Sequence, residues 1–290
     1  MKGIILAGGS ATRFYPVSYS INKHLVPIYD KPAIYYPLCT LMLADIKEIL
    51  LITKSSNIND FKKLFGDGSH LGINISYANQ EKPKGIAEAF IIAKDFISNS
   101  SVCLILGDNI FYSPDFEKIF LESKINVNDA LIFAYRTDKL ENYGVIELDL
   151  NNKPLYLQEK PKNYTNNAYA VPGLYMYRSC VVKIAESLKP SERGELEITD
   201  VNKFYLRENK LSVKILPDKS FWFDIGTCEN TYKATKATRE IYLNQGHNLS
   251  CPEEVAYRKR FVSKQDIEEL IKKMPFCSYR EYLTRSILDR

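Results

Sequence analysis

MKGIILAGGSATR, residues 1–13, is an apolar run that passes directly into a loop of small residues. The run Ile4-Ile5-Leu6 is typical of a short buried strand. The small residues after it allow a ligand to approach the backbone closely, and consecutive free N–H groups can bind an anion. Arg13 adds a planar fork of donors suited to phosphate. A tight strand-to-helix turn with a surface arginine explains the same stretch, so it is not decisive alone.

Predicted strands and helices alternate through the first 110 residues. After the first strand, short apolar runs predict strands at 47–53, 73–78 and 101–106. Helices are expected at 35–44, at 57–65 with Asn57 or Asn59 as its cap, and at 86–97. This alternation predicts the α/β class, with a Rossmann-like mixed, mostly parallel central sheet flanked by helices.

The rest of the chain divides into a strand-rich middle and a helical end. Strands are expected at 130–135, 144–150, 155–158, 169–177, 211–216 and 220–223, with a helix at 181–188. Helices are expected at 231–244, 253–261, 264–274 and 279–288. The change near Gly226 indicates a core at 1–226 and a helical C-terminal region at 227–290.

Three predicted strands end in polar or glycine-rich segments. The first ends in the Gly8-Gly9 loop, the third in Asn79-Gln80 with Gly85 opening the next helix, and the fourth in Gly107-Asp108-Asn109. Ligands of such sheets bind outside the carboxyl ends of the strands. We therefore expect these segments to converge on one crevice.

Two carboxylates, Asp108 and Asp224, lie at predicted strand ends beside small residues. A hard cation such as Mg²⁺ takes one or two carboxylates together with phosphate oxygens and water. One aspartate from each of two strands meets that need. Two ordinary turn aspartates are the alternative, because Asp is a favoured turn residue.

Candidate cations for phosphate binding are Lys160, in Glu159-Lys160-Pro161, and Lys23, in a stretch without helical periodicity close after the first loop. Exposed surface lysines explain both equally well. The acid-rich segment 193–200 is attributed mainly to a helix N-terminus, where acids are favourable. Metal-bridged phosphates beside such cations suit in-line displacement at phosphorus.

Composition excludes several classes of protein. The net charge is only +4, from 39 Lys and Arg against 35 Asp and Glu, so we expect no nucleic-acid partner. No apolar run approaches the roughly 18 to 20 residues of a membrane span. The six cysteines lack a C-x-x-C pair and are expected to be buried free thiols, which favours a cytoplasmic location. The three histidines are too far apart in sequence to predict a histidine metal site.

Six motifs in order carry a resemblance to a known family. They are MKGIILAGGSATRFYP (1–16), PIYDKPAIYYPL (27–38), LGDNIFY (106–112), EKP (159–161), KPSERGELEITD (189–200) and CPEEVAYRK (251–259). Together they resemble the sugar-nucleotide pyrophosphorylases, and most specifically the thymidylyltransferases that act on glucose 1-phosphate. The resemblance spans nearly the whole chain and favours the functional interpretation of each residue above.

The resemblance implies a single displacement, in which glucose 1-phosphate attacks the α-phosphorus of dTTP with Mg²⁺ bound. The products are dTDP-glucose and pyrophosphate, and the reaction opens dTDP-deoxysugar synthesis, for example of rhamnose for lipopolysaccharide or O-antigen. It implies a nucleotide-binding half at about 1–110 and a sugar-binding half at about 111–226. Residues 227–290 would serve oligomerisation, as a homotetramer, and allosteric regulation.

The resemblance also implies roles for particular residues. Arg13, Lys23, Lys160 and Asp108 would be catalytic, and Asp108 and Asp224 would hold the metal. Nucleotide binding would fall to Gly8, Gly9, Ser10, Thr12, Arg13, Gln80, Gly85 and Asp108. Sugar-phosphate binding would fall to Asn109, Tyr143, Gly144, Glu159, Lys160, Val171 and Trp222. The allosteric site would include Tyr112, Glu254 and Arg258.

Four positions depart from the family pattern. Ala11 replaces a glycine, which costs roughly 1 kcal/mol or more if the position needs a positive φ. His24 stands where Gln is usual, Lys84 where Asp is common, and Pro172 where Thr is usual. These departures leave open the preference for dTTP over UTP and for glucose 1-phosphate over another hexose or amino-sugar 1-phosphate.

Two other classes of function fit the sequence less well. A non-catalytic subunit that binds nucleotide sugars would not need Asp108, Asp224 and Lys160 together, and all three are present. An NAD-dependent oxidoreductase would need G-x-G-x-x-G after the first strand, and the loop does not match it.

Overall fold

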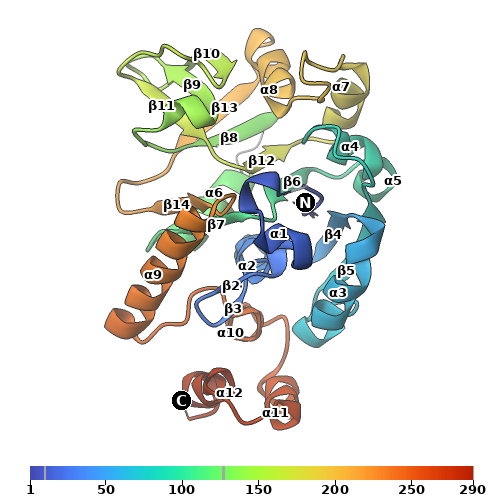
Figure 1. Cartoon of the computed structure of the whole chain (residues 1–290), viewed down its shortest axis with the longest axis vertical. Helices are drawn as coiled ribbons and strands as arrows, with labels where there is room; N and C mark the ends of the chain where they lie inside the picture. Colours follow the sequence, from blue (N-terminus) through green and yellow to red (C-terminus); the bar gives the residue numbers. More distant parts are fainter. Residues whose placement is uncertain (10, 126–127, 290) are drawn as a thin grey trace.

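The structure is a computed structural model that describes residues 1–9, 11–125 and 128–289. Its centre is a seven-stranded sheet in the order β13-β8-β12-β6-β1-β4-β5 (Figure 1). β12 runs antiparallel to both neighbours, whereas every other pairing in the sheet is parallel. The predicted mixed, mostly parallel sheet is confirmed. The strands are β1 (Lys2–Leu6), β4 (Glu48–Thr53), β5 (Asn74–Asn79), β6 (Val102–Leu106), β8 (Ala130–Ala134), β12 (Leu174–Tyr177) and β13 (Leu211–Ile215).

Helices cover both faces of this sheet. Successive side chains of a strand point to opposite faces, so Ile4 and Ile5 enter two different hydrophobic clusters and both are buried. Burial on both faces explains why these strands read as continuous apolar runs. The helices of this part are α1 (Val17–Ser20), α2 (Tyr35–Leu43), α3 (Ser55–Phe65), α4 (Glu88–Ile92), α5 (Lys94–Ile97), α6 (Phe116–Ile125), α7 (Val181–Ser187) and α8 (Ile198–Arg207).

Smaller sheets border the carboxyl ends of the central strands. A three-stranded sheet has the order β10-β9-β11, and β14 pairs with β7. The antiparallel β7–β14 pair places Asp224 opposite Asn109. The strands are β2 (Pro27–Ile28), β3 (Lys31–Pro32), β7 (Asn109–Tyr112), β9 (Gly144–Leu148), β10 (Pro154–Glu159), β11 (Ala168–Val171) and β14 (Phe221–Asp224).

The C-terminal region is helical, as predicted. Thr227 caps α9 by accepting from the N–H of Asn230, and Ser263 and Asp266 form a capping box at α11. α11 and α12 lie at the far end of the molecule from the three-stranded sheet (Figure 1). None of the helices in the described ranges is long and apolar enough for a bilayer crossing. The helices are α9 (Cys228–Gln245), α10 (Pro252–Arg258), α11 (Lys264–Lys273) and α12 (Ser278–Leu283), followed by a π-helical segment at Thr284–Leu288.

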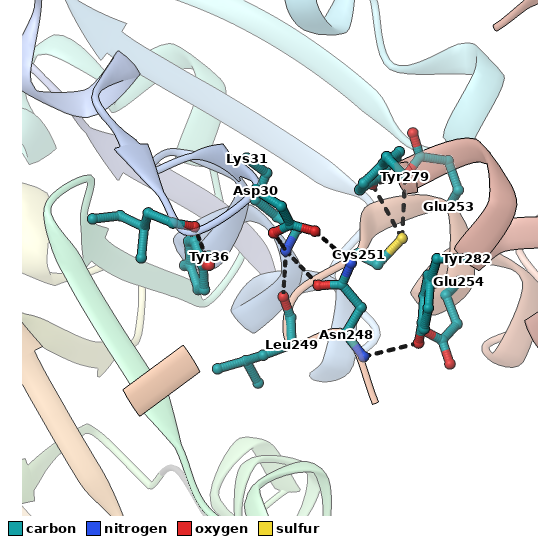
Figure 2. Close-up of polar contacts among 11 residues, drawn as sticks. Asp30, Lys31, Tyr36, Asn248, Leu249, Cys251, Glu253, Glu254, Tyr279 and Tyr282 are labelled. Atoms are coloured by element: carbon teal, nitrogen blue, oxygen red, sulfur yellow. Dashed lines mark hydrogen bonds and ion pairs between the residues drawn. The ribbon is translucent and has the colours of Figure 1, made fainter. Parts of the chain in front are cut away.

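A buried polar network joins the β2–β3 hairpin to the C-terminal helices (Figure 2). Lys31 Nζ donates to Asp30 Oδ1 at 2.5 Å, to Asn248 Oδ1 at 2.6 Å and to Leu249 O at 3.0 Å. Tyr282 accepts from the Asn248 N–H at 3.0 Å and donates to Glu254 Oε2 at 2.6 Å. Because Lys31 is only 3% exposed, these acceptors are what makes its burial tolerable.

Several sequence predictions of detail were wrong. Neither Asn57 nor Asn59 caps the helix there, because α3 begins two residues earlier, after Lys54. The helix expected at 86–97 is interrupted at Ala93, which lies between α4 and α5. Its φ of −87° and ψ of 8° depart from helical values. β7 and α6 were not predicted at all.

The strand expected at 169–177 is two strands in two sheets. Pro172 has no N–H to donate to a ladder, and the Gly173 N–H donates to the side chain of Asn109 instead. β11 therefore ends at Val171 in the small sheet, and β12 begins at Leu174 in the large one.

The cysteine prediction was half right. All six thiols are free, but three of them are exposed rather than buried: Cys180, Cys228 and Cys277.

Candidate active site

The loop after β1 lies at the carboxyl edge of the central sheet. Gly8 faces the buried Gln80, and a Cβ built on Gly8 would lie 2.5 Å from Gln80 Oε1. Glycine is therefore needed at position 8 for Gln80 to occupy this place. Ser10 lies outside the described residues. Thr12 and Arg13 are exposed and form a 3-10 turn with the buried Phe14.

Ala11 adopts a left-handed conformation, with a φ of 50° and a ψ of 37°. The cost predicted for an alanine here depended on a positive φ at position 11, and the structure has one. An alanine there costs roughly 1 to 2 kcal/mol relative to an unstrained conformation, which a glycine avoids. The strain is confined to the turn that presents Arg13.

A first cavity of about 190 Å³, the loop cavity, opens beside this loop. The predicted convergence of strand ends is seen here, because segments after β1, β5 and β6 all contribute. Its lining includes Gly9, Lys23, Gln80, Gly85 and Asp108.

Asp108 follows β6 in a position fixed by several neighbours. Lys23 Nζ forms a close ion pair with Asp108 Oδ2, and Asn109 Nδ2 donates to Oδ1 at 2.9 Å. Burial opposes ionisation, but the charge of Lys23 and these hydrogen bonds prevail and lower the pKa of Asp108. His24 beside it is buried, and burial followed by the Lys23 charge lowers its pKa to about 3, so the imidazole is neutral.

Asp224, the last residue of β14, is brought to Asp108 by the β7–β14 pairing. The Ile225 N–H donates to the Asp108 carbonyl at 3.0 Å, and the Gly226 N–H donates to Asp224 Oδ1 at 2.9 Å. Burial first and the Asp108 charge second raise the pKa of Asp224. The second carboxylate oxygen of Asp224 accepts no hydrogen bond from the described part of the chain.

This pair of carboxylates fits Mg²⁺. No group of three or more His, Cys, Asp and Glu side chains suited to a metal occurs within the described ranges. Mg²⁺ needs only one or two carboxylates when phosphates and water complete its shell. Burial and the charge of Asp108 both disfavour the ionised form of Asp224, and a bound cation would offset this cost.

Arg13 reaches from the first loop to this carboxylate pair. Its guanidinium lies against Gly226, where a Cβ would come within 3.0 Å of Nη2 and within 2.9 Å of Asp224 Oδ1. The same arginine lines the inter-sheet cavity described next.

A second cavity of about 230 Å³, the inter-sheet cavity, lies between the central sheet and the three-stranded sheet. Strand register places Glu159, Gly144 and Val171 side by side across β10, β9 and β11. All the residues that the resemblance assigned to sugar phosphate are in its wall: Asn109, Tyr143, Gly144, Glu159, Lys160, Val171 and Trp222. Arg13, Asp108 and Asp224 line it as well.

The aromatic part of this wall is locked in place by packing. The rings of Tyr143 and Trp222 are 4.7 Å apart between centroids, and Trp222 Nε1 donates to Asn109 Oδ1 at 2.6 Å. Lys160 has a positive φ of 44°, and its N–H donates to the Tyr143 carbonyl at 2.9 Å. This turn directs the backbone so that Lys160 lines the cavity.

The segment 193–200 contributes more to the cavity than a helix start. α8 begins only at Ile198, and Arg193, Glu195, Glu197 and Thr199 line the inter-sheet cavity. Thr199 Oγ1 donates to Glu159 Oε2 at 2.6 Å. The many charged residues of segment 193–200 could have indicated a place in the site. The sequence prediction assigned them to a helix N-terminus instead.

A third cavity of about 430 Å³, the α10 cavity, lies away from the carboxylate pair. It brings together Tyr112, Glu254 and Arg258, the three residues that the resemblance assigned to regulation. Arg258 Nη2 donates to Glu117 Oε2 at 2.8 Å, and Tyr112 donates to Gln245 Oε1 at 3.2 Å.

Comparison with known proteins places the chain among nucleotidyl transferases. The family model described as "Nucleotidyl transferase" matches residues 2–241. A glucose-1-phosphate thymidylyltransferase of Neisseria meningitidis is 46% identical over 98% of this chain and 99% of its own. One of Mycolicibacterium smegmatis is 45% identical over 100% of both chains.

Solved structures agree with this result. A Bacillus anthracis protein, described as a candidate glucose-1-phosphate thymidylyltransferase in complex with sucrose, has a TM-score of 0.76 at 37% identity, over 86% of this chain and 98% of its own. A UDP-glucose pyrophosphorylase complexed with UDP-glucose has a TM-score of 0.72 at 23% identity, over 82% of this chain and 98% of its own. The second likeness concerns the fold alone.

Proposed function

The chain belongs to the nucleotidyl transferase family, and we propose that it is a glucose-1-phosphate thymidylyltransferase. It joins dTTP to glucose 1-phosphate and releases dTDP-glucose and pyrophosphate. One observation carries this proposal above the others: Asp108 lines both the loop cavity and the inter-sheet cavity, and Asp224 and Arg13 line the inter-sheet cavity with it. Two phosphorylated substrates entering from the two cavities would meet at these carboxylates.

The reaction is a single displacement at phosphorus. A phosphate oxygen of glucose 1-phosphate forms a bond to the α-phosphorus of dTTP, and the bond from that phosphorus to the oxygen bridging to the β-phosphate breaks. Pyrophosphate carries the electron pair away. No covalent enzyme residue is needed, so the protein contributes positioning and charge stabilisation.

Each side of the site holds one substrate. On the nucleotide side, Gly8, Gly9, Ser10, Thr12 and Arg13 bind the triphosphate, and Lys23 assists. Gln80 and Gly85 contact the edge of the base. On the sugar side, Lys160 binds the sugar phosphate, and Asn109, Tyr143, Gly144, Glu159, Val171 and Trp222 form the sugar pocket.

Asp108 and Asp224 hold Mg²⁺ in this proposal. When bound, the ion neutralises phosphate charge at the reacting centre. Lys23, which is paired with Asp108 in this structure, would assist in binding the triphosphate.

The proposal extends to assembly and context. We place regulation by a nucleotide sugar at the α10 cavity and the enzyme in a cytoplasmic homotetramer built through residues 227–290. Its product would supply dTDP-deoxysugar synthesis for surface polysaccharides such as O-antigen. The free thiols support a reducing compartment.

A pyrophosphate-release assay tests the proposal. Purified protein with Mg²⁺ is given dTTP or UTP together with glucose 1-phosphate or glucosamine 1-phosphate. We expect the dTTP and glucose 1-phosphate pair to give the highest kcat/KM. A higher value for UTP or for the amino sugar would reassign the substrate, and no pyrophosphate with any pair would refute the activity.

A further inference from the structure

Gln80 is held at its amide nitrogen by Glu88. Gln80 Nε2 donates to Glu88 Oε2 at 2.7 Å, and the same carboxylate oxygen accepts from the Lys84 N–H at 3.1 Å. The two side chains come from different elements, since Gln80 follows β5 and Glu88 opens α4. Glu88 thus ties the segment between β5 and α4 to the side chain that lines the loop cavity.

This contact fixes which end of the Gln80 amide faces the cavity. A carboxylate accepts hydrogen bonds and cannot donate them, so only Nε2 can face Glu88. Oε1 is thereby turned away from Glu88 and lies over Gly8, where a side chain would exclude it. Within the described ranges no donor is hydrogen-bonded to Oε1, although Gln80 is only 4% exposed.

The loop cavity therefore presents an oriented acceptor. Gly85 lines the same cavity, and its backbone N–H donates to no acceptor in the described part of the chain. One acceptor and one free donor in the same cavity complement a ring edge that carries an N–H next to a carbonyl. Thymine and uracil have that edge at N3 and O4, whereas cytosine presents a lone pair and an amino group, the reverse pattern.

We propose that Glu88 is a positioning residue for nucleobase selection. By holding Nε2 of Gln80, it commits Oε1 to accept the N3–H of a thymine or uracil base and to repel the lone pair of cytosine. This inference rests on the proposed function, and it concerns a residue that touches neither the base nor the reacting phosphorus.

Three variants at position 88 separate orientation from simple support. Glu88→Met keeps the length and helix propensity but removes the acceptor, so the Gln80 amide can turn over. Glu88→Lys replaces the acceptor with a donor and should reverse the amide. Glu88→Gln can place its amide oxygen where Oε2 lies and still accept from both Gln80 and Lys84. Asp95→Asn, an exposed acid in α5, is the matched control for the loss of a charge.

The test measures kcat and KM for dTTP and dCTP at saturating glucose 1-phosphate. We expect Glu88→Met to lower the ratio of kcat/KM for dTTP over dCTP by about tenfold, the value of one hydrogen bond to an oriented acceptor. The change should lie in the KM for dTTP, with kcat within about twofold, since the base is remote from the reacting phosphorus. Glu88→Lys should shift the ratio further toward dCTP. Glu88→Gln should stay within about threefold of the parent ratio, and Asp95→Asn should not change it.

Several outcomes would overturn the inference. If kcat/KM falls equally for dTTP and dCTP in Glu88→Met, Glu88 only supports the loop. The same conclusion follows if Glu88→Gln lowers the ratio of kcat/KM for dTTP over dCTP as much as Glu88→Met does. If one variant does not fold, the other two still decide. If the parent protein releases no pyrophosphate, the proposed function fails, and calorimetric binding of dTTP and dCTP to the same variants tests Glu88 independently. Equal affinity of the parent for both nucleotides would then refute it.

Discussion

Asn109 donates a hydrogen bond from Nδ2 to Oδ1 of Asp108 at 2.9 Å. The other end of the same amide accepts from the Gly173 N–H at 3.0 Å and from Trp222 Nε1 at 2.6 Å. Asn109 is only 2% exposed, and both ends of its amide are engaged. Asn109 therefore connects Asp108, which we propose as a metal ligand, to Trp222 in β14 and to Gly173 just before β12, besides lining the inter-sheet cavity.

Asn109→Ala is expected to cost both stability and turnover. It leaves two buried donors, Gly173 N–H and Trp222 Nε1, without an acceptor, which should lower the free energy of unfolding by roughly 2 to 4 kcal/mol. Urea denaturation measures this. Asn109→Asp keeps an acceptor for both donors but places a second charge against Asp108, so it should keep more of the stability while turnover falls. Equal stability of Asn109→Ala and the parent protein would contradict this role.

Asp224→Asn is expected to stabilise the metal-free protein while abolishing turnover. The raised pKa of Asp224 means that the folded protein holds a proton that the unfolded chain releases. That contribution to stability is fully present below the ordinary pKa of 3.8 and is lost as the pH rises through the raised pKa. At pH 7 without metal, the asparagine should therefore raise the free energy of unfolding by roughly 1 to 3 kcal/mol.

Urea midpoints of the parent and Asp224→Asn, taken from pH 4 to pH 8 with EDTA present, check this prediction. The gap between the two proteins should widen as the pH rises. A parent protein more stable than the variant at pH 7 would show that burial and the Asp108 charge do not disfavour the ionised form of Asp224.

Gly226→Ala is expected to lower turnover with little change in stability. The added Cβ would lie 3.0 Å from Arg13 Nη2 and 2.9 Å from Asp224 Oδ1, so one of them must move. A displacement of this kind should reduce kcat by about tenfold or more. Gly66→Ala is the control, because its positive φ of 55° strains the backbone but its Cβ meets nothing within 4 Å. Gly66→Ala should lose stability and keep turnover. If Gly226→Ala keeps full turnover, Arg13 lies outside the site.

Lys31→Met is expected to lower the free energy of unfolding without changing turnover. It removes the buried cation of the network in Figure 2 and leaves Asp30 and Asn248 facing an apolar group. We expect a loss of roughly 3 kcal/mol in urea. Lys63→Met breaks an exposed pair with Asp60 and should cost under about 1 kcal/mol. Equal losses in the two variants would show that burial adds nothing to the Lys31 contacts.

The central sheet could be predicted because its strands are buried on both faces. The apolar runs of β1, β4 and β6 leave little choice of secondary structure. The sequence could not show that the strand predicted at 169–177 is two strands, because the two halves have a similar apolar pattern and differ in the strands with which they pair. That pairing is set by Pro172 and by the bond from Gly173 to Asn109, a residue 64 positions away.

The sequence named residues that the fold brings together, but it could not give their geometry. Most of the catalytic and substrate-binding residues that the resemblance named line the loop cavity or the inter-sheet cavity, whereas Gly8 and Thr12 line neither, and all of their roles stay predictions. Asp108 and Asp224 meet only through the β7–β14 pairing, which no local pattern announces. The positive φ of Ala11 and the contact between Gln80 and Glu88 likewise follow from tertiary structure.

Turnover of dTTP and glucose 1-phosphate by the parent protein and by Asp108→Asn, both with Mg²⁺, decides whether this chain transfers a nucleotide at the Asp108–Asp224 pair. Pyrophosphate and dTDP-glucose should form in equal amounts with the parent protein. Asp108→Asn should lose at least about a hundredfold in kcat while keeping its fold by circular dichroism. Near-normal turnover by Asp108→Asn would remove Asp108 from the reacting centre, and no product from the parent protein would refute the activity.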